Sequence, residues 1–280
     1  MNINLVNNYP SLRFGTTRTQ KIVNDTLINS NRTDFCRSDM DWNRFSDYLI
    51  KKYPNGTKIH CYACSDGSEP YTVTLKLIKK LGKKEAQKFF PIIASDIDED
   101  RIKKNNEGIL GLRKAADLHK IRMCLQQTGI KLEDILSPAK VSPEKIQERY
   151  KYEIKQYEIK GILKDAVKFK TANIVEDTKK KFPKNSVIMF RNAWAYLKPE
   201  EERQLTQNLN KNLSKNSMVV IGAFEHNYSY ATEHLLEKSF RVVDKKEPMI
   251  KTGHKITQKL PLGVVYKGLS GEFPGVFLKK

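Results

Sequence analysis

A strand, a tight turn, a helix and a second strand follow one another between Ile59 and Asp98, and this order constrains the fold more than any other feature. The apolar run from Ile59 ends in a turn of small residues that contains Gly67. A helix is predicted from Glu69, with Ser68 as its N-cap, because apolar residues then recur at helical spacing. Such a turn leaves its backbone exposed at the carboxyl end of a strand, where open α/β sheets bind ligands.

The second strand, Pro91 to Ala94, leads to Asp96, at the position where dinucleotide-binding folds place a carboxylate for ribose hydroxyls. The turn has one glycine rather than three, and the acidic side chains of Asp66 and Glu69 would repel a pyrophosphate. A cofactor with a ribose, a cationic centre and no phosphate suits these acids better. S-adenosylmethionine has all three properties, so the segment predicts a methyl-donor site.

Six short blocks accompany this segment in a fixed order along the chain. They are Thr33–Arg37, Ser65–Tyr71, Ser95–Asp98, Asn173–Ile174, Phe190–Asn192 with Tyr196, and Gly222–Glu225. From Asn31 to about Tyr266 the chain resembles the CheR-type chemotaxis protein-glutamate methyltransferases, which carry such blocks. The sequence departs from the family at Cys36, where the family has phenylalanine, and at Asp66 to Glu69, where it has Thr-Gly-Glu-Glu.

The resemblance implies an α/β fold, a Rossmann-like seven-stranded methyltransferase sheet with a small inserted antiparallel β-subdomain. We predict a lead-in over residues 1–30, a methyltransferase domain over 31–270 with the insertion at 111–165, and a tail over 271–280. In the family the insertion helps to hold the protein substrate; a purely structural insertion is the alternative. The family's N-terminal helical domain, which contributes to docking on chemoreceptor helices, is expected to be absent.

Periodicity adds further elements to this frame. A short helix is predicted over Thr19 to Asn29, and an amphipathic helix over Asp41 to Lys52 that should pack on the sheet. A second helix is predicted over Pro199 to Leu213. The remaining sheet strands are predicted at 166–169, 187–190 and 218–221, with 240–243 and 263–266 as a reversed last hairpin.

The resemblance assigns roles to single residues. Asp96 would bind the ribose, and Glu69 would lie near the amino group or the sulfonium, although it could merely complement a helix dipole. Arg37 and Tyr196 are the predicted catalytic residues, beside the reacting carboxylate and the transferring methyl. The other predicted cofactor contacts are Asn31, Thr33, Asn173, Ile174, Arg191 and Asn192, with Arg37 contributing to both sets.

The chemistry implied by the resemblance needs little catalytic apparatus. A glutamate side chain is already anionic at neutral pH, so its oxygen can attack a sulfonium methyl in line without a general base. The five histidines show no triad or chelating spacing, which agrees with this. Cys61 and Cys64 form one close pair, with no second pair to complete a zinc site, so no metal is predicted.

The chain carries 51 Lys and Arg against 32 Asp and Glu, a formal charge of +19, which attracts acidic partners. The lysines are dispersed rather than interleaved with aromatic residues, so a nucleic-acid groove is not indicated. The expected partner is an acidic protein substrate such as a receptor-like helix. No run approaches the ~20 apolar residues of a bilayer crossing, so membrane insertion is not expected and a cytoplasmic location with reduced thiols is predicted.

Two other functions remain open at this stage. The same cofactor could methylate a small molecule, another protein group or nucleic acid. The chain could also be a non-catalytic module that binds S-adenosylmethionine or its demethylated product, S-adenosylhomocysteine, and regulates a partner. The oligomeric state cannot be derived from the sequence.

Overall fold

The fold is described from a computed structural model. The description covers residues 21–23, 26–28, 33, 35–113, 116–140, 154–222, 239–252, 257–259, 265–267, 271–273 and 275–280.

A seven-stranded sheet forms the centre of the molecule, in the order β11-β16-β10-β9-β3-β4-β8. The strands are β3 (Ile59–Tyr62), β4 (Ile92–Asp96), β8 (Val167–Thr171), β9 (Val187–Phe190), β10 (Met218–Val220), β11 (Phe240–Val242) and β16 (Val276–Lys279). Neighbours from β8 to β10 are parallel, whereas β16 runs antiparallel to both β10 and β11. The predicted fold class is confirmed. Because β3 lies between β4 and β9, chain segments that follow these three strands meet at one edge of the sheet.

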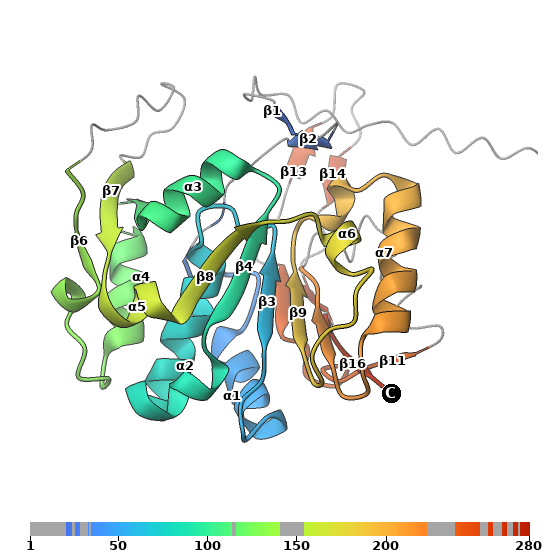
Figure 1. The fold of residues 1–280 in the computed structure, drawn as a ribbon, viewed down its shortest axis with the longest axis horizontal. Helices are drawn as coiled ribbons and strands as arrows, with labels where there is room; N and C mark the ends of the chain where they lie inside the picture. The colour runs from blue at the N-terminus through green and yellow to red at the C-terminus, as the bar shows by residue number, and fades with distance from the viewer. Residues whose placement is uncertain are drawn as a thin grey trace, which may run out of the picture.

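Helices cover both faces of this sheet (Figure 1). The longer helices are α1 (Trp42–Lys52), α2 (Ser68–Ala86), α3 (Glu99–Glu107), α4 (Ala116–Leu125) and α7 (Pro199–Asn212). Shorter ones are α5 (Gly161–Ala166), α6 (Ile174–Asp177) and the 3-10 turns η1 (Gln87–Phe89), η2 (Leu132–Asp134) and η3 (Trp194–Tyr196).

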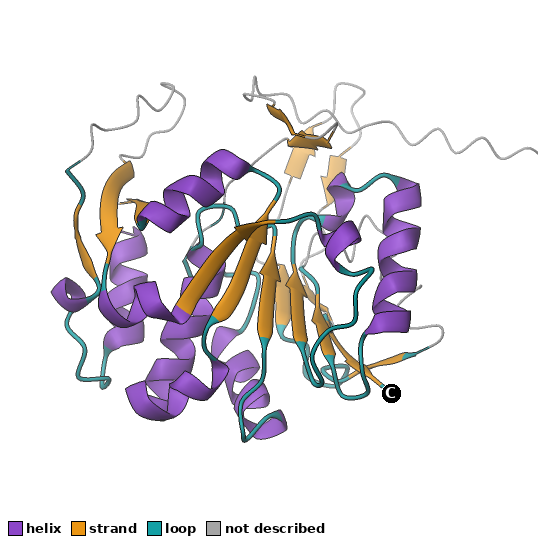
Figure 2. Cartoon of the chain, viewed as in Figure 1, coloured by secondary structure: helices purple, strands orange, loops and turns teal. Residues whose placement is uncertain are grey.

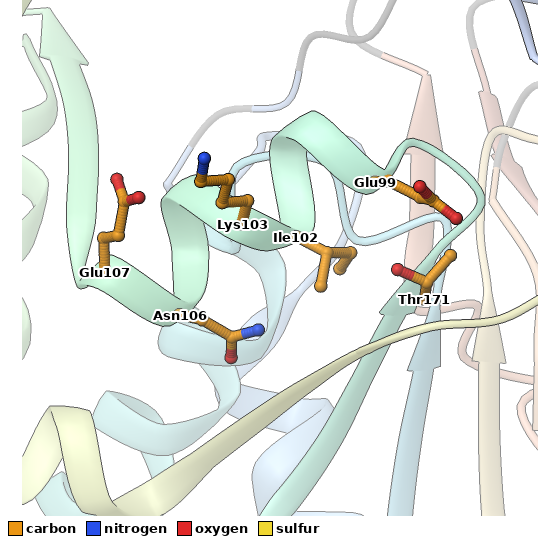
Figure 3. A pocket seen from close by; sticks show the side chains of 6 residues that line it. All are labelled: Glu99, Ile102, Lys103, Asn106, Glu107 and Thr171. Carbon is orange, nitrogen blue, oxygen red and sulfur yellow. The ribbon is translucent and has the colours of Figure 1, made fainter.

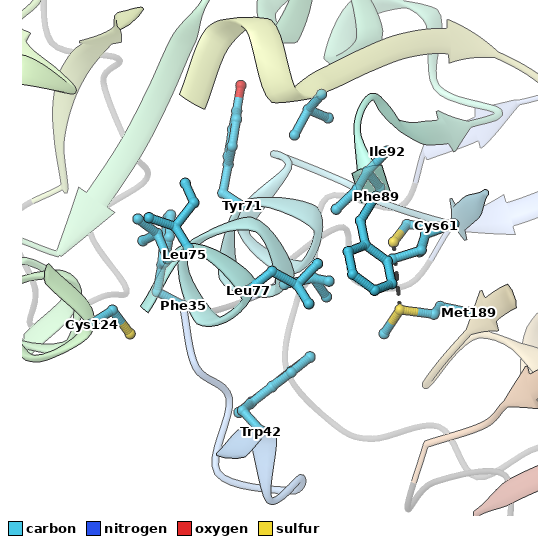
Figure 4. Packing of buried hydrophobic residues seen from close by; sticks show 14 of the residues in the cluster. Phe35, Trp42, Cys61, Tyr71, Leu75, Leu77, Phe89, Ile92, Cys124 and Met189 are labelled. Atoms are coloured by element: carbon cyan, nitrogen blue, oxygen red, sulfur yellow. Dashed lines mark hydrogen bonds between the residues drawn. The ribbon is translucent and has the colours of Figure 1, made fainter. Parts of the chain in front are cut away.

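Alternation along the central strands divides the core in two. In β9, Val187 and Met189 join the core that includes α1 and α2, whereas Ile188 and Phe190 join the core that includes α6 and α7. This is the period-two burial expected of strands covered on both sides. Figure 4 shows the first of these cores, in which side chains of α2 pack near the sheet residue Met189. The predicted helix over residues 41–52 is confirmed, with its apolar stripe buried.

A second, three-stranded antiparallel sheet is built from the inserted region, in the order β5-β7-β6. Its strands are β5 (Ile109–Arg113), β6 (Leu136–Pro138) and β7 (Ile154–Ile159). Figure 2 shows β6 and β7 beyond the β8 edge of the main sheet. The predicted antiparallel unit is therefore present, and its first strand begins at Ile109, slightly before the expected start of the insertion.

Three sequence predictions are wrong in detail. The helix predicted over residues 19–29 is a strand pair, β1 (Lys21–Val23) and β2 (Thr26–Ile28). The described part of the segment 263–266 lies outside the main sheet: β14 (Val265–Lys267) pairs with β13 (Thr257–Lys259) in a small separate sheet. The strand that pairs with β11 is instead β16, within the segment assigned to a tail. A further pair joins β12 (Ile250–Thr252) to β15 (Gly271–Phe273).

None of the helices described here combines the length and apolar character that a bilayer crossing requires.

Candidate functional site

The turn after β3 is held in a constrained conformation. Ala63, Ser65 and Gly67 have positive φ angles of 53°, 52° and 83°, although only the last is glycine. Cβ-bearing residues pay a steric cost in this region, and such strain concentrates at functional sites. A Cβ at Gly67 would lie 2.9 Å from the Phe169 ring, so glycine is required there for space as well as for φ. Gly67 is the residue that precedes α2; Ser68 is its first residue, so the predicted Ser68 N-cap is wrong.

Hydrogen bonds tie this turn to the end of β4. The backbone N–H of Ser65 donates to Asp96 Oδ2 at 2.8 Å, and the Asp98 N–H donates to Oδ1 at 3.0 Å. The Ser65 carbonyl accepts from the Asn105 amide at 2.7 Å. Asp98 N-caps α3 and accepts from Asp100 N and Arg101 N. Asp96 is therefore a buried acceptor fixed by backbone N–H groups, and a carboxylate has further lone pairs that could accept from ribose hydroxyls.

The end of β8 also joins this edge. The Ala172 N–H donates to the Asp96 carbonyl at 3.0 Å, which brings the next two residues, Asn173 and Ile174, beside the end of β4. Asn173 Oδ1 accepts from Val175 N at 2.8 Å and so N-caps α6. The Asn173 side chain thus has a structural use in addition to the predicted cofactor contact, and Ile174 is buried as the first residue of α6.

A network of charged side chains lies across the ends of β3 and β9. Arg191 follows β9 and donates to Glu69 Oε2 at 2.6 Å and to Asp39 Oδ1 at 2.8 Å. Asp39 Oδ2 accepts from the Asn192 amide at 2.9 Å and lies 3.4 Å from Arg37 Nε. We call these five residues the arginine network. It unites four of the predicted site residues with Asp39, which the sequence analysis did not single out.

Burial and charge set the protonation of the arginine network. The Arg191 side chain has no exposed surface, and burial alone would lower its pKa, but the carboxylates of Asp39 and Glu69 raise it. Burial raises the pKa of Glu69 against the opposing effect of Arg191. For Asp39, by contrast, Arg191 and Arg37 outweigh burial and lower the pKa. Arg191 is therefore a permanent cation that holds two carboxylates in place.

Trp42, the first residue of α1, also supports this network. Its ring lies under the Arg191 guanidinium, with 4.9 Å from Cζ to the ring centroid, and its Nε1–H donates to the Arg37 carbonyl at 2.8 Å. No sequence spacing marks Asp39. The structure shows that Asp41, two residues later, N-caps α1, so the cap does not occupy Asp39.

Asn192 is held by a neighbouring strand end as well. Its φ is 59°, and a Cβ on Gly222, which follows β10, would lie 2.5 Å from its Oδ1. Glycine at 222 therefore permits a close approach between two of the blocks that the sequence singled out.

The remaining predicted residues are placed as follows. Tyr196 is half-buried at the end of η3, where its N–H donates to the Ala193 carbonyl at 3.0 Å. Thr33 is half-buried in the segment that leads to Arg37. Asn31, and residues 223–225 of the last block, lie outside the described residues.

A surface depression of about 470 Å³ adjoins these strand ends. Figure 3 shows its lining residues, which are Glu99, Ile102, Lys103, Asn106, Glu107 and Thr171, on α3 and at the end of β8. It contains no member of the arginine network and not Asp96. The fixed polar groups at the strand ends, rather than this depression, locate the site.

The polar groups fit a cationic, phosphate-free nucleoside ligand. Three acidic residues, Asp66, Glu69 and Asp96, lie at or beside the ends of β3 and β4, where a pyrophosphate would be repelled. Arg191 Nε is buried and has no hydrogen-bond partner among the described residues, a costly state that a ligand acceptor would relieve. Within the same residues, no three His, Cys, Asp or Glu side chains gather in a way that could hold a metal ion.

Comparison with known proteins agrees with this geometry. Residues 31–133 and 134–239 match the CheR methyltransferase SAM-binding domain. A chemotaxis protein methyltransferase from Borreliella burgdorferi is 25% identical over 209 residues, which make up 71% of this chain and 65% of that protein. The chain thus spans just under two thirds of that relative's length.

Solved structures show a more distant likeness. A TehB-like SAM-dependent methyltransferase from Corynebacterium glutamicum gives a TM-score of 0.39 at 12% identity, over 85% of this chain and 87% of that one. PKMT2 from Rickettsia typhi, in complex with AdoHcy, gives 0.34 at 11% identity, over 68% and 26%. Scores this low carry no functional information. The family match covers most of the chain and includes the strand ends described above, so the chain belongs to the CheR methyltransferase family and carries its S-adenosylmethionine-binding domain.

Proposed function

We propose that this chain transfers a methyl group from S-adenosylmethionine to glutamate carboxylates of an acidic protein. The observation that carries the proposal is the arginine network, in which the partly exposed Arg37 lies next to buried charged groups at the strand ends. The family match supports the cofactor, and the relative's name, chemotaxis protein methyltransferase, supports a protein acceptor.

The acidic residues are proposed to bind the cofactor. Asp96 would accept hydrogen bonds from the ribose hydroxyls, since its backbone contacts fix the carboxylate in advance. Glu69, held by Arg191 through Oε2, would face the cationic part of the ligand. Asn173 and Ile174 would line the adenine, while Asn192, Thr33 and Asn31 would complete the pocket.

Arg37 is proposed to bind the acceptor carboxylate. Its side chain is 40% exposed, whereas Arg191 is fully buried, so Arg37 is the member of the network that an incoming protein can reach. Its Nε lies 3.4 Å from Asp39, which orients the guanidinium without a short ion pair. A guanidinium can hold a carboxylate through two parallel hydrogen bonds.

The reaction then depends on alignment. S-adenosylmethionine, when bound, supplies a methyl group on a sulfonium leaving group. Arg37 would fix one carboxylate and exclude alternative orientations, and the Tyr196 hydroxyl would donate to its second oxygen or help to orient the methyl. Neither residue needs to accept a proton, because the attacking oxygen is already anionic. Fixed orientation of this kind can lower a barrier by several kcal/mol.

Incubation of the purified chain with methyl-labelled S-adenosylmethionine and bacterial extract tests the proposal. We expect label on protein that is released by mild alkali, as carboxyl methyl esters are. Arg37→Ala should abolish the labelling, whereas Arg203→Ala, which removes an exposed arginine from α7, should not.

Three outcomes would contradict the proposal in different ways. Alkali-stable label would indicate another acceptor. Label on small molecules or nucleic acid would do the same. Tight binding of the cofactor with no transfer would indicate a non-catalytic regulatory module. Calorimetric titration with S-adenosylmethionine and S-adenosylhomocysteine, carried out first, establishes that the cofactor is bound.

A further inference from the structure

Two cysteines that are far apart in the sequence meet beside the proposed acceptor site. Cys36 and Cys124 are separated by 88 positions, and their Sγ atoms lie 3.4 Å apart. Both are free thiols, as are Cys61 and Cys64. Cys36 is half-buried and Cys124, on α4, is buried, so the pair is reachable from the Cys36 side. We call Cys36 and Cys124 the thiol pair.

Positive charge surrounds the thiol pair. The Lys79 ammonium on α2 donates to the carbonyl of Met123, the residue before Cys124, at 2.8 Å. The pKa of Cys124 is lowered to about 7, because the Cys36 thiol hydrogen-bonds to its sulfur and because Lys76 and Lys79 are near; these effects outweigh burial. The same contact, together with burial, raises the pKa of Cys36. The two sulfurs thus share one proton near neutral pH, and because either can be the donor, the sulfur that an oxidant reaches can carry the reactive thiolate.

The thiol pair is coupled to the arginine network through the backbone. Cys36 is the residue before Arg37, has a φ of 44°, and donates its N–H to Thr72 Oγ1 at 2.9 Å. On its other side, Phe35 stacks on Tyr71 with the two rings 3° from parallel. Figure 4 shows Phe35 and Cys124 on neighbouring segments. A displacement of Cys36 therefore acts directly on the segment that positions Arg37.

We propose that Cys36 and Cys124 form a reversible disulfide under peroxide, and that its formation slows methyl transfer by displacing Arg37. The second part rests on the proposed function. The thiolate attacks one oxygen of the peroxide and the O–O bond breaks. Hydroxide departs as the leaving group, and the attacking sulfur becomes a sulfenic acid. The other thiol then attacks the same sulfur, the S–S bond forms, and its proton leaves with the hydroxyl as water. The two electrons pass from sulfur to peroxide, and a dithiol reverses the change.

The short distance between the two sulfurs favours a disulfide, and forming it would shift the segment that carries Arg37. An S–S bond measures about 2.05 Å, so the two sulfurs must approach by roughly 1.3 Å from the present 3.4 Å. Part of this movement can come from α4 and part from the segment at Cys36. A misplacement of about 1 Å at a catalytic group can reduce a rate by about a hundredfold, so a measurable loss is expected.

The disulfide is tested without any activity assay. The reduced protein is treated with hydrogen peroxide, its remaining thiols are alkylated after unfolding, and proteolytic peptides are identified by mass spectrometry. We expect a linked peptide containing Cys36 and Cys124 that dithiothreitol dissolves, with Cys61 and Cys64 still alkylated. Cys61→Ala should form the same link, and Cys124→Ser should not. Four alkylated thiols after peroxide, or a link that involves Cys61 or Cys64, would overturn the proposal.

The consequence is measured on reduced, oxidised and re-reduced protein. We expect the oxidised form to transfer methyl groups at least roughly tenfold more slowly, with recovery after reduction, while Cys124→Ser stays insensitive to peroxide. An oxidised protein with the link and an unchanged rate would overturn the coupling to Arg37. If reduced protein labels no protein at all, the proposed function fails, and peptide mapping still decides whether the thiol pair closes.

Discussion

Arg191 and Glu69, 122 positions apart in the chain, form an ion pair of 2.6 Å that joins the end of β9 to the first turn of α2. Asp39 adds a second pair with the same guanidinium, at 2.8 Å. Three separate chain segments therefore depend on one buried cation. In this arrangement, side chains proposed to bind the cofactor also hold these segments together.

Replacement of Arg191 by methionine should lower the free energy of unfolding by about 3–5 kcal/mol, because two partly buried carboxylates lose their counterion. Urea denaturation measures this loss. Arg203→Met removes an arginine whose side chain is 61% exposed, and should change the free energy by less than about 0.5 kcal/mol. Equal effects of the two substitutions would show that the arginine network contributes little to stability.

Asp96→Ala should weaken S-adenosylmethionine binding by ~1.5–3 kcal/mol, the cost of losing charge-assisted hydrogen bonds. Titration calorimetry on protein shown to be folded measures the change. Asp98→Ala is the control, since Asp98 caps α3: it should cost about 1 kcal/mol of stability and leave the affinity unaltered. Unchanged affinity in Asp96→Ala would exclude the ribose role.

Asp66→Asn should stabilise the protein in a pH-dependent manner. Burial raises the pKa of Asp66 to about 6, against an unfolded value of about 3.9. The folded state therefore binds the proton more tightly, and wild-type stability falls as pH rises from about 4 to 6. Above pH 6 the buried carboxylate is ionised and lowers the free energy of unfolding by its full amount. Asp66→Asn should therefore raise the free energy of unfolding by about 1–3 kcal/mol there and change it little near pH 4. Urea denaturation across this range measures the difference; a gain that is independent of pH would contradict the assignment.

Gly222→Ala should displace Asn192, because the new Cβ would lie 2.5 Å from its Oδ1 and 2.7 Å from its backbone nitrogen. We expect a loss of about 1–3 kcal/mol in stability, together with weaker cofactor binding. Gly82→Ala makes a useful comparison. Gly82 has open space around it but a φ of 78°, so this substitution should strain α2 and leave the affinity as it was. Thermal denaturation and calorimetry of both variants separate the two effects.

Much of the frame was predictable because local patterns determine it. The β3 turn, the strand that ends at Asp96 and the helix over residues 42–52 follow from periodicity and from polar residues at strand ends. The strand that pairs with β11 could not be predicted in this way, because the segments 263–266 and 276–279 are both short and mostly apolar. Only tertiary pairing distinguishes them, and a sequence pattern contains no information about which strand is the neighbour.

The sequence singled out most of the residues that meet at the strand ends, but not the contacts between them. Arg191, Asn192, Glu69 and Arg37 were found through their blocks, but the carboxylate between them, Asp39, has no distinctive spacing. Long-range contacts explain this, since Asp39 and Arg191 are 152 positions apart. The meeting of Cys36 with Cys124 has the same explanation, since 88 positions separate them and no sequence spacing indicates the contact.

The position of β16 between β10 and β11 also has a consequence for biosynthesis. During translation, β11 emerges from the ribosome before the strand that must separate it from β10. Until residues 276–279 arrive, both neighbours expose unpaired backbone groups, which are templates for wrong association. The order of synthesis thus leaves this corner of the nascent chain open to chaperones until β16 has been made.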